Sequence, residues 1–298
     1  MGRNTRIHVN GKSAKSKLFS VSDCQSIVKK AIVENLKSAY RTSVLPESAE
    51  EVIVEVGLLR DRASLTLDCC GAGLSRRGYR TFNVAAPLSE TLGAAIVLLS
   101  RYRADDTLVD PMCGSGTMPI EAAMIAQNRA PGLNRRFSAE EWTFLPTSCW
   151  VRAREEARDL IRNVPVDILG SDIDERCIQV CKQHAKKAGV MVNWEVKPLK
   201  DFTKTNEKGV LVVNPPYGER LMEKNDAANL YQQMREVFSD LDGWSKNIIS
   251  GYRDFEKAYG KRADKRRKLS NGGLTCTLYQ YFRERPTVDS GMHWKKQD

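Results

Sequence analysis

Three short polar segments hold the residue types that bind ligands, and each directly follows an apolar run. Asp110–Thr117 (DPMCGSGT) is a glycine turn with an acid in front, Gly170–Asp174 (GSDID) is rich in acids, and Asn214–Tyr217 (NPPY) follows a valine-rich run. Ligands of open α/β sheets bind at the carboxyl ends of strands. The positions of the three segments therefore predict one shared ligand site.

The glycine turn favours some ligands over others. It lacks the Lys-Ser/Thr pair of a triphosphate-binding loop, and it lacks the third glycine of a dinucleotide site. Two glycines, Gly114 and Gly116, behind the acid Asp110 suit a ligand with a positively charged amino-acid part better than a pyrophosphate. By itself the turn does not name that ligand.

Asp172 follows the predicted strand at residues 167–170, where a carboxylate can accept both ribose hydroxyls of an adenosine. The alternative is that Asp172 caps the next helix, a role in which aspartate is common. Asp174 lies nearer that helix and can cap it instead, which leaves Asp172 available to a ligand.

The NPPY segment is the most specific of the three. Pro215 and Pro216 stiffen the turn and remove two N–H donors. The Asn214 side-chain carbonyl and the Pro215 carbonyl can then accept both hydrogens of a planar amine, while Tyr217 stacks on the ring that carries it. An ordinary Asn-Pro turn is the alternative. The position after a strand favours a site that holds a nucleobase amine for alkylation.

The order of predicted helices and strands along the whole chain indicates two domains, residues 1–80 and 81–298. The first reads as a small α+β unit with a positive face, made of a helix and a hairpin. In the second, strand and helix alternate from residue 104 to 250, which predicts a doubly wound, mostly parallel α/β sheet, and later strands can add an antiparallel edge. The predicted helices span about 21–40, 85–102, 118–126, 150–163, 174–187 and 228–241, and the strands 51–58, 63–69, 107–110, 167–170, 191–196, 210–213, 246–250 and 274–282.

Charge is unevenly distributed along the 298 residues, whose formal net charge is +10. Lys and Arg concentrate in residues 1–44, 76–80 and 257–268. One such cluster alone can be a solvated face. Several of them, together with a nucleobase-type site, predict a nucleic acid as the partner.

Other classes of protein fit the composition poorly. No apolar run approaches the ~18–20 residues of a membrane span, and the basic N-terminal stretch lacks the apolar segment of a secretory signal. The eight cysteines show no Cys-x-x-Cys spacing, so no metal site is predicted and Cys177 and Cys181 are expected in the core. A reducing cytoplasm fits best.

The three motifs together resemble class I S-adenosyl-L-methionine-dependent methyltransferases that modify amino groups. With APLSETL at 86–92 and NRAPGLNRRF at 128–137, essentially the whole chain is similar to bacterial THUMP-domain RNA methyltransferases. These are the guanine-N2 methyltransferases of 23S rRNA, often labelled N6-adenine-specific DNA methylases. Residues 1–80 resemble the latter part of a THUMP module. Family members usually have a ferredoxin-like segment before this point, so the sequence departs from the family pattern at its N-terminus.

The resemblance also implies roles for individual residues. Asp172 would bind the ribose of S-adenosyl-L-methionine, and Asp201 would accept from its adenine amine. Asn214, Pro215, Pro216 and Tyr217 would hold the target base. The methionine portion would be held by Asp110, Cys113, Gly114, Ser115, Gly116 and Thr117, with Pro87 and Leu88 near its end.

Two alternatives remain open at this point. The NPPY motif can hold any base that bears an amine, so adenine-N6 methylation of DNA or RNA is one. An RNA-binding or assembly protein with a degenerate cofactor pocket is the other.

Overall fold

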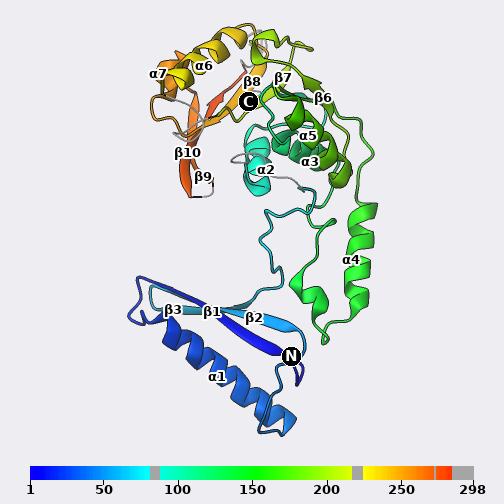
Figure 1. Ribbon diagram of the computed structural model, residues 1–298, viewed down its shortest axis with the longest axis vertical. Helices are drawn as coiled ribbons and strands as arrows, with labels where there is room; N and C mark the ends of the chain where they lie inside the picture. Colours follow the sequence, from blue (N-terminus) through cyan, green and yellow to red (C-terminus); the bar gives the residue numbers. More distant parts are fainter. Residues whose placement is uncertain (81–87, 217–223, 272, 284–298) are drawn as a thin grey trace, which may run out of the picture. The chain divides into compact units, whose positions relative to one another are not determined.

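The computed structural model describes residues 1–80, 88–216, 224–271 and 273–283 (Figure 1). Most of the observed helices and strands lie where the apolar periodicity of the sequence predicts them. In chain order the elements are β1 (Arg6–Ala14), α1 (Val21–Tyr40), β2 (Glu51–Leu59), β3 (Arg62–Leu67), α2 (Glu90–Leu99), β4 (Thr107–Asp110), α3 (Thr117–Ala126), η1 (Ser138–Glu141), α4 (Thr147–Asp159), β5 (Ile168–Asp172), α5 (Glu175–Ala188), β6 (Asn193–Val196), η2 (Leu199–Asp201), β7 (Gly209–Val213), α6 (Lys224–Val237), β8 (Trp244–Ser250), α7 (Phe255–Tyr259), β9 (Lys265–Asn271) and β10 (Leu274–Tyr281).

The chain forms two compact units. One contains Met1–Arg77 together with Ala130–Leu160, and the other contains Gly78–Arg129 together with Ile161–Asp298. The segment Ala130–Leu160 therefore lies within the sequence of the second unit but packs with the first. The sequence alone placed a single division near residue 80.

The first unit is built on a three-stranded sheet in the order β1-β2-β3. Strand β1 is parallel to β2, and β3 is antiparallel to β2. Helix α1 covers one face, because its apolar residues pack on Ile7, Val9, Val54 and Val56. This helix has the bounds that its periodicity predicts. Strand β1 has no counterpart in the sequence prediction.

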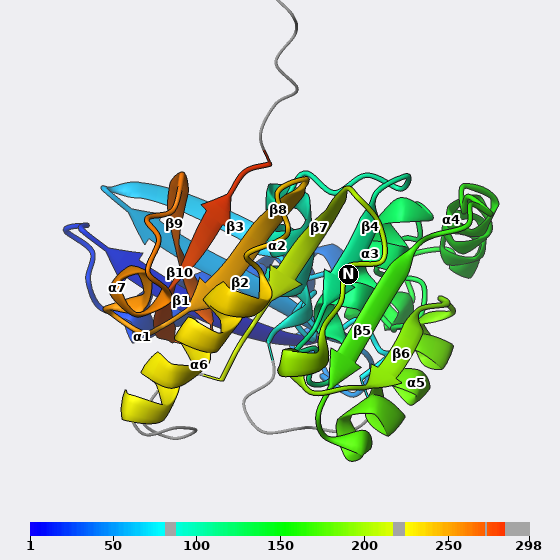
Figure 2. The ribbon, with the colours of Figure 1, turned by 90° about the horizontal axis from the view of Figure 1, so that it is seen from above.

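The second unit contains a seven-stranded sheet in the order β6-β5-β4-β7-β8-β10-β9 (Figure 2). Pairings along β6, β5, β4, β7 and β8 are parallel, whereas β10 is antiparallel to both of its neighbours. This arrangement confirms the doubly wound sheet with an antiparallel edge. Strand β4 lies between β5 and β7. The chain passes from β4 to β5 and β6 on one side and then returns to β7 on the other side. Ligands bind at such switch points.

Helices cover both faces of this sheet, and β7 shows the consequence for the sequence. Val210 and Val212 belong to the core shared with α2 and α3, while Leu211 and Val213 belong to the core shared with α6 and α7. A strand buried on both faces needs apolar residues at every position. The continuous apolar run before Asn214 has this physical origin.

Candidate active site

The three polar segments meet at one edge of the sheet. Strand β4 ends at Asp110, β5 ends at Asp172, and β7 ends one residue before Asn214. The three strands are parallel neighbours in the order β5-β4-β7. Their carboxyl ends therefore lie side by side, as the sequence predicts.

The glycine turn between β4 and α3 is fastened to β5 by main-chain groups. Gly114 and Gly116 have φ values of 54° and 78°, in the left-handed region that favours glycine. The Gly114 N–H donates to Asp172 Oδ2 at 2.9 Å, and the Cys113 N–H donates to the Ser171 carbonyl at 2.9 Å. These bonds hold the turn beside the end of β5.

The two glycines differ in what surrounds them. A Cβ at Gly116 would lie 2.7 Å from the Trp194 ring and 2.9 Å from Cys181 Sγ, so that glycine is required by packing. A Cβ at Gly114 would meet nothing within 4 Å. Open space beside a glycine that bonds Asp172 is what a ligand held by the turn would need.

Asp110 is buried under this turn, with only 1% of its surface exposed. Burial raises the pKa of its carboxyl well above the ordinary range; the Met112 N–H at 3.2 Å lowers the pKa, and the neighbouring Asp172 raises it further. A cationic group nearby would favour the carboxylate form. The methionine ammonium of S-adenosyl-L-methionine fits such a position.

Asp172 and Asp174 both lie just before α5, and one of them caps this helix while the other can bind a ligand. Asp174 is the N-cap of α5, and its side chain accepts from the Arg176 N–H at 2.9 Å, as expected. Asp172 accepts one N–H on each oxygen, from Gly114 and from Asp174. Each carboxylate oxygen can accept more than one hydrogen bond, so Asp172 still fits the hydroxyls of a ribose.

Asn214 has a buried side-chain oxygen, Oδ1, that finds no hydrogen-bond partner among the described residues. Buried acceptors in folded proteins are nearly always satisfied. Pro215 next to it is buried as well. An acceptor of this kind at the end of β7 fits the amine of a substrate base.

The other predicted residues are more scattered. Asp201 lies in η2 after β6 and is exposed, and Leu88 is buried before α2. Ser115 and Thr117 are buried in the turn, with their hydroxyls 3.4 Å apart. Pro87 and Tyr217 lie outside the described residues.

Arg80 has a different role from the one its sequence position indicated. Its Nη2 donates to the Leu88 carbonyl and to Thr117 Oγ1, both at 2.7 Å, and Nη1 lies 3.8 Å from the Glu90 carboxylate. Arg80 is partly buried; Arg77 is buried, and it donates to the Leu74 carbonyl. The prediction that segment 76–80 contacts RNA is therefore wrong for these two residues, whose guanidinium groups bond protein carbonyls. Arg76 is exposed.

Sequence reasoning missed two residues that support the turn. His184 on α5 is fully buried, and its Nδ1–H donates to the Ser115 carbonyl at 3.2 Å. Burial lowers the pKa of His184, which favours the neutral ring that makes this bond. Trp194 on β6 packs with Cys113, Ile178 and Cys181 under the turn. Nothing in the local sequence pattern of either residue marks this role.

The described residues contain no group of three or more His, Cys, Asp or Glu side chains that could hold a metal ion. Within the same residues, no helix is both long and apolar enough to cross a bilayer.

Comparison with known families finds two matches along the chain. Residues 1–68 match the THUMP domain, and residues 77–280 match the family described as RMKL-like, methyltransferase domain. The second match includes the glycine turn, Asp172, Asp201 and the NPPY segment.

Individual relatives agree with this assignment. The Bacillus subtilis protein named "Putative RNA methyltransferase YpsC" is 46% identical over 284 residues, which are 94% of this chain and 74% of that protein. A Listeria monocytogenes crystal structure described as a "predicted N6-adenine-specific DNA methylase" is 44% identical, with a TM-score of 0.89 over 95% of this chain and 75% of that one. The crystal structure described as "SMU.472, a putative methyltransferase complexed with SAH" is 41% identical, with a TM-score of 0.87 over 96% of this chain and 77% of that one. The chain therefore belongs to the RMKL-like methyltransferase family and has a THUMP domain ahead of its methyltransferase domain.

Proposed function

We propose that this protein transfers a methyl group from S-adenosyl-L-methionine to the exocyclic N2 amine of a guanine in 23S rRNA. The family assignment and the SAH complex of SMU.472 support the cofactor. The THUMP match and the name of YpsC support RNA as the substrate class. Guanine N2 and 23S rRNA come from the resemblance of the motifs.

The observation that carries the proposal is the unpartnered Oδ1 of Asn214. In the proposed complex this oxygen and the Pro215 carbonyl accept the two hydrogens of the amine. Such bonds favour the pyramidal nitrogen of the transition state, in which the lone pair is no longer conjugated with the ring. Tyr217 would stack on the base.

The cofactor would lie over the glycine turn. Asp172 would accept from the ribose hydroxyls, Asp201 would accept from the adenine amine, and Asp110 would offset the ammonium charge. Cys113–Thr117 would enclose the methionine portion, with Pro87 and Leu88 near its end. The space beside Gly114 is available for this purpose.

S-adenosyl-L-methionine supplies a methyl group that its sulfonium already activates. The residues of the chain then have mainly to align the amine with that carbon. A nitrogen–carbon bond forms as the carbon–sulfur bond breaks, and the proton leaves the amine afterwards. No strongly basic side chain is required. A base within an RNA helix must first be unstacked to reach Asn214.

The test uses the purified protein, labelled S-adenosyl-L-methionine and rRNA from a strain that lacks the gene. We expect labelled N2-methylguanosine when the nucleosides of 23S rRNA are separated by mass spectrometry. Label in N6-methyladenosine would mean that the target is the N6 amine of adenine and not the N2 amine of guanine, in line with the name of the Listeria relative. Cofactor binding without label in any nucleoside would favour a non-catalytic RNA-binding protein.

A further inference from the structure

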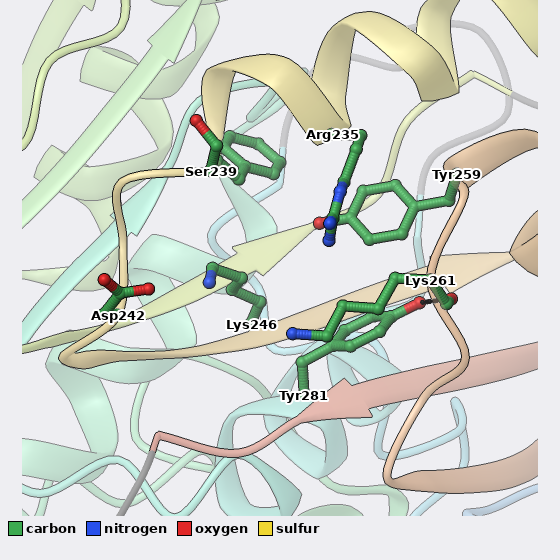
Figure 3. Close-up of a pocket in the computed structure, with 8 residues that line it drawn as sticks. Arg235, Ser239, Asp242, Lys246, Tyr259, Lys261 and Tyr281 are labelled. Carbon is green, nitrogen blue, oxygen red and sulfur yellow. Dashed lines mark hydrogen bonds between the residues drawn. The ribbon is translucent and has the colours of Figure 1, made fainter.

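A cavity lies in the methyltransferase unit, apart from the residues of the proposed active site. Its volume is about 180 Å³, and it is lined by residues of α6, α7, β8, β10 and the loops beside them (Figure 3). Asp242 in its wall precedes β8, whereas Asn214 follows the end of β7, to which β8 is parallel. The cavity shares no residue with the predicted cofactor site.

Three cationic side chains from three different elements line this cavity. Arg235 comes from α6, Lys246 from β8 and Lys261 from the loop after α7. The lining contains one carboxylate, Asp242. Within the described part of the chain, no ion pair joins any of these three cations to an acid. The cavity therefore has an excess of positive charge.

Lys246 is half-buried, whereas Arg235 and Lys261 are exposed at the mouth of the cavity. Burial lowers the pKa of the Lys246 ammonium, the neighbouring Lys261 and Arg235 lower it further, and Asp242 acts in the opposite direction. The nearby carboxylate thus does not compensate for the surrounding positive charge. A bound anion would supply that compensation.

The aromatic wall adds a hydroxyl donor and rigidity. Tyr259 is buried between Phe255 and Tyr281, at ring-centroid distances of 5.3 and 5.2 Å. Its hydroxyl makes no hydrogen bond within the described residues and points toward the Arg235 guanidinium in Figure 3. Burial raises the pKa of Tyr259 to about 12, so the hydroxyl keeps its proton. The Tyr281 hydroxyl donates to the Lys261 carbonyl at 3.0 Å and fixes the loop that carries this lysine.

We propose that this cavity binds a phosphate group, held by Arg235, Lys246, Lys261 and the Tyr259 hydroxyl. A phosphate has several acceptor oxygens and pairs well with a guanidinium and with ammonium groups. Cations from three elements around a small cavity can surround such a tetrahedral anion.

The phosphate can come from RNA or from a small molecule. RNA is favoured by continuity, because exposed basic residues follow Lys261 directly along the chain, at Arg262, Lys265 and Lys268. In that case the cavity anchors one backbone phosphate of the substrate. This assignment to RNA rests on the proposed function, whereas phosphate binding itself does not.

The first experiment is a magnetic resonance titration of the full chain with inorganic phosphate at constant ionic strength. We expect saturable binding that Lys246→Met and Arg235→Gln each weaken by about tenfold or more. Lys182→Met removes an exposed cation on α5 and should leave binding unchanged. Absence of saturable binding, or equal binding by Lys246→Met and the wild type, would overturn the proposal. Neither result depends on S-adenosyl-L-methionine or on methyl transfer.

The second experiment identifies the source of the phosphate. RNA affinity is measured against salt concentration for the wild type, Lys246→Met and Lys182→Met. If RNA supplies the phosphate, loss of one contact should reduce the slope of log affinity against log salt by about 0.7–0.9 in Lys246→Met. An unchanged slope, with phosphate binding lost, would assign the cavity to a small phosphorylated molecule.

Discussion

Asn214 shows how a single residue can indicate a ligand. Leaving a buried acceptor without a hydrogen bond costs about 1–3 kcal/mol, and the Oδ1 of Asn214 is in that state among the described residues. A substrate amine that donates to it would recover this free energy in the complex. The cost in the free protein is thus consistent with a binding role, since strained or unsatisfied groups concentrate at functional sites.

Replacing this residue should separate chemistry from cofactor binding. Asn214→Ala removes the proposed acceptor, so we expect methyl transfer to fall by about 100-fold or more. Its affinity for S-adenosyl-L-methionine, measured by calorimetry, should stay close to that of the wild type. Asp172→Ala is the matched comparison, and it should weaken cofactor binding first. If Asn214→Ala loses both properties equally, the base-holding role is wrong.

At the scale of elements, the turn from β4 to α3 uses its two glycines differently. Both adopt positive φ, but Gly116 accommodates Trp194 and Cys181, whereas Gly114 faces open space. The backbone strain of a substitution is therefore similar at the two positions, and the packing cost is not. A substitution at Gly114 therefore tests whether the cofactor needs the space beside this residue, because it causes no packing clash within the protein.

Gly114→Ala should impair cofactor binding in addition to a modest loss of stability. Positive φ costs an alanine roughly 1–2 kcal/mol of stability, and the new methyl group occupies the space proposed for the cofactor. We expect affinity for S-adenosyl-L-methionine to fall by about tenfold, or about 1.4 kcal/mol. Gly260→Ala is the control, because Gly260 has a φ of 73° and also nothing within 4 Å. Equal cofactor affinity in both variants would contradict the placement of the cofactor.

At the scale of the whole molecule, one arginine joins the two sequence segments of the first unit. Arg135 belongs to the segment Ala130–Leu160, and it donates to the carbonyls of Cys70, Ala72, Gly73 and Arg76 in Met1–Arg77. Only 8% of its surface is exposed. Bonds from a buried charged donor are among the stronger ones, so Arg135 is expected to hold this unit together.

Arg135→Leu should loosen the first unit and spare the second. Loss of these hydrogen bonds leaves several carbonyls unsatisfied, at a cost of about 3 kcal/mol or more. Amide hydrogen exchange should become faster in β2 and stay unchanged in β8. Arg152→Leu, at an exposed arginine of α4 in the same unit, should alter neither strand. Equal acceleration of exchange in β2 and β8 would mean that the effect is not confined to the first unit.

The sequence by itself determined what depends on local pattern. Period and composition predicted α1 and the alternating strands and helices of the second unit, and the fold class is confirmed. The carboxyl ends of parallel strands must share an edge, so the order of strands and motifs is enough to place Asp110, Asp172 and Asn214 near one another. The roles assigned to them remain predictions.

Tertiary structure alone decided the features that depend on distant partners. Strand β1 has two buried apolar residues and then a polar stretch, and it forms because β2 pairs with it. Strand β9 reads as a basic segment, yet β10 provides its pairing edge. The cavity between Arg235, Lys246 and Lys261, the position of Ala130–Leu160 and the support of the turn by His184 and Trp194 also join residues far apart in sequence. Packing brings such residues together, and no local periodicity encodes which ones will meet.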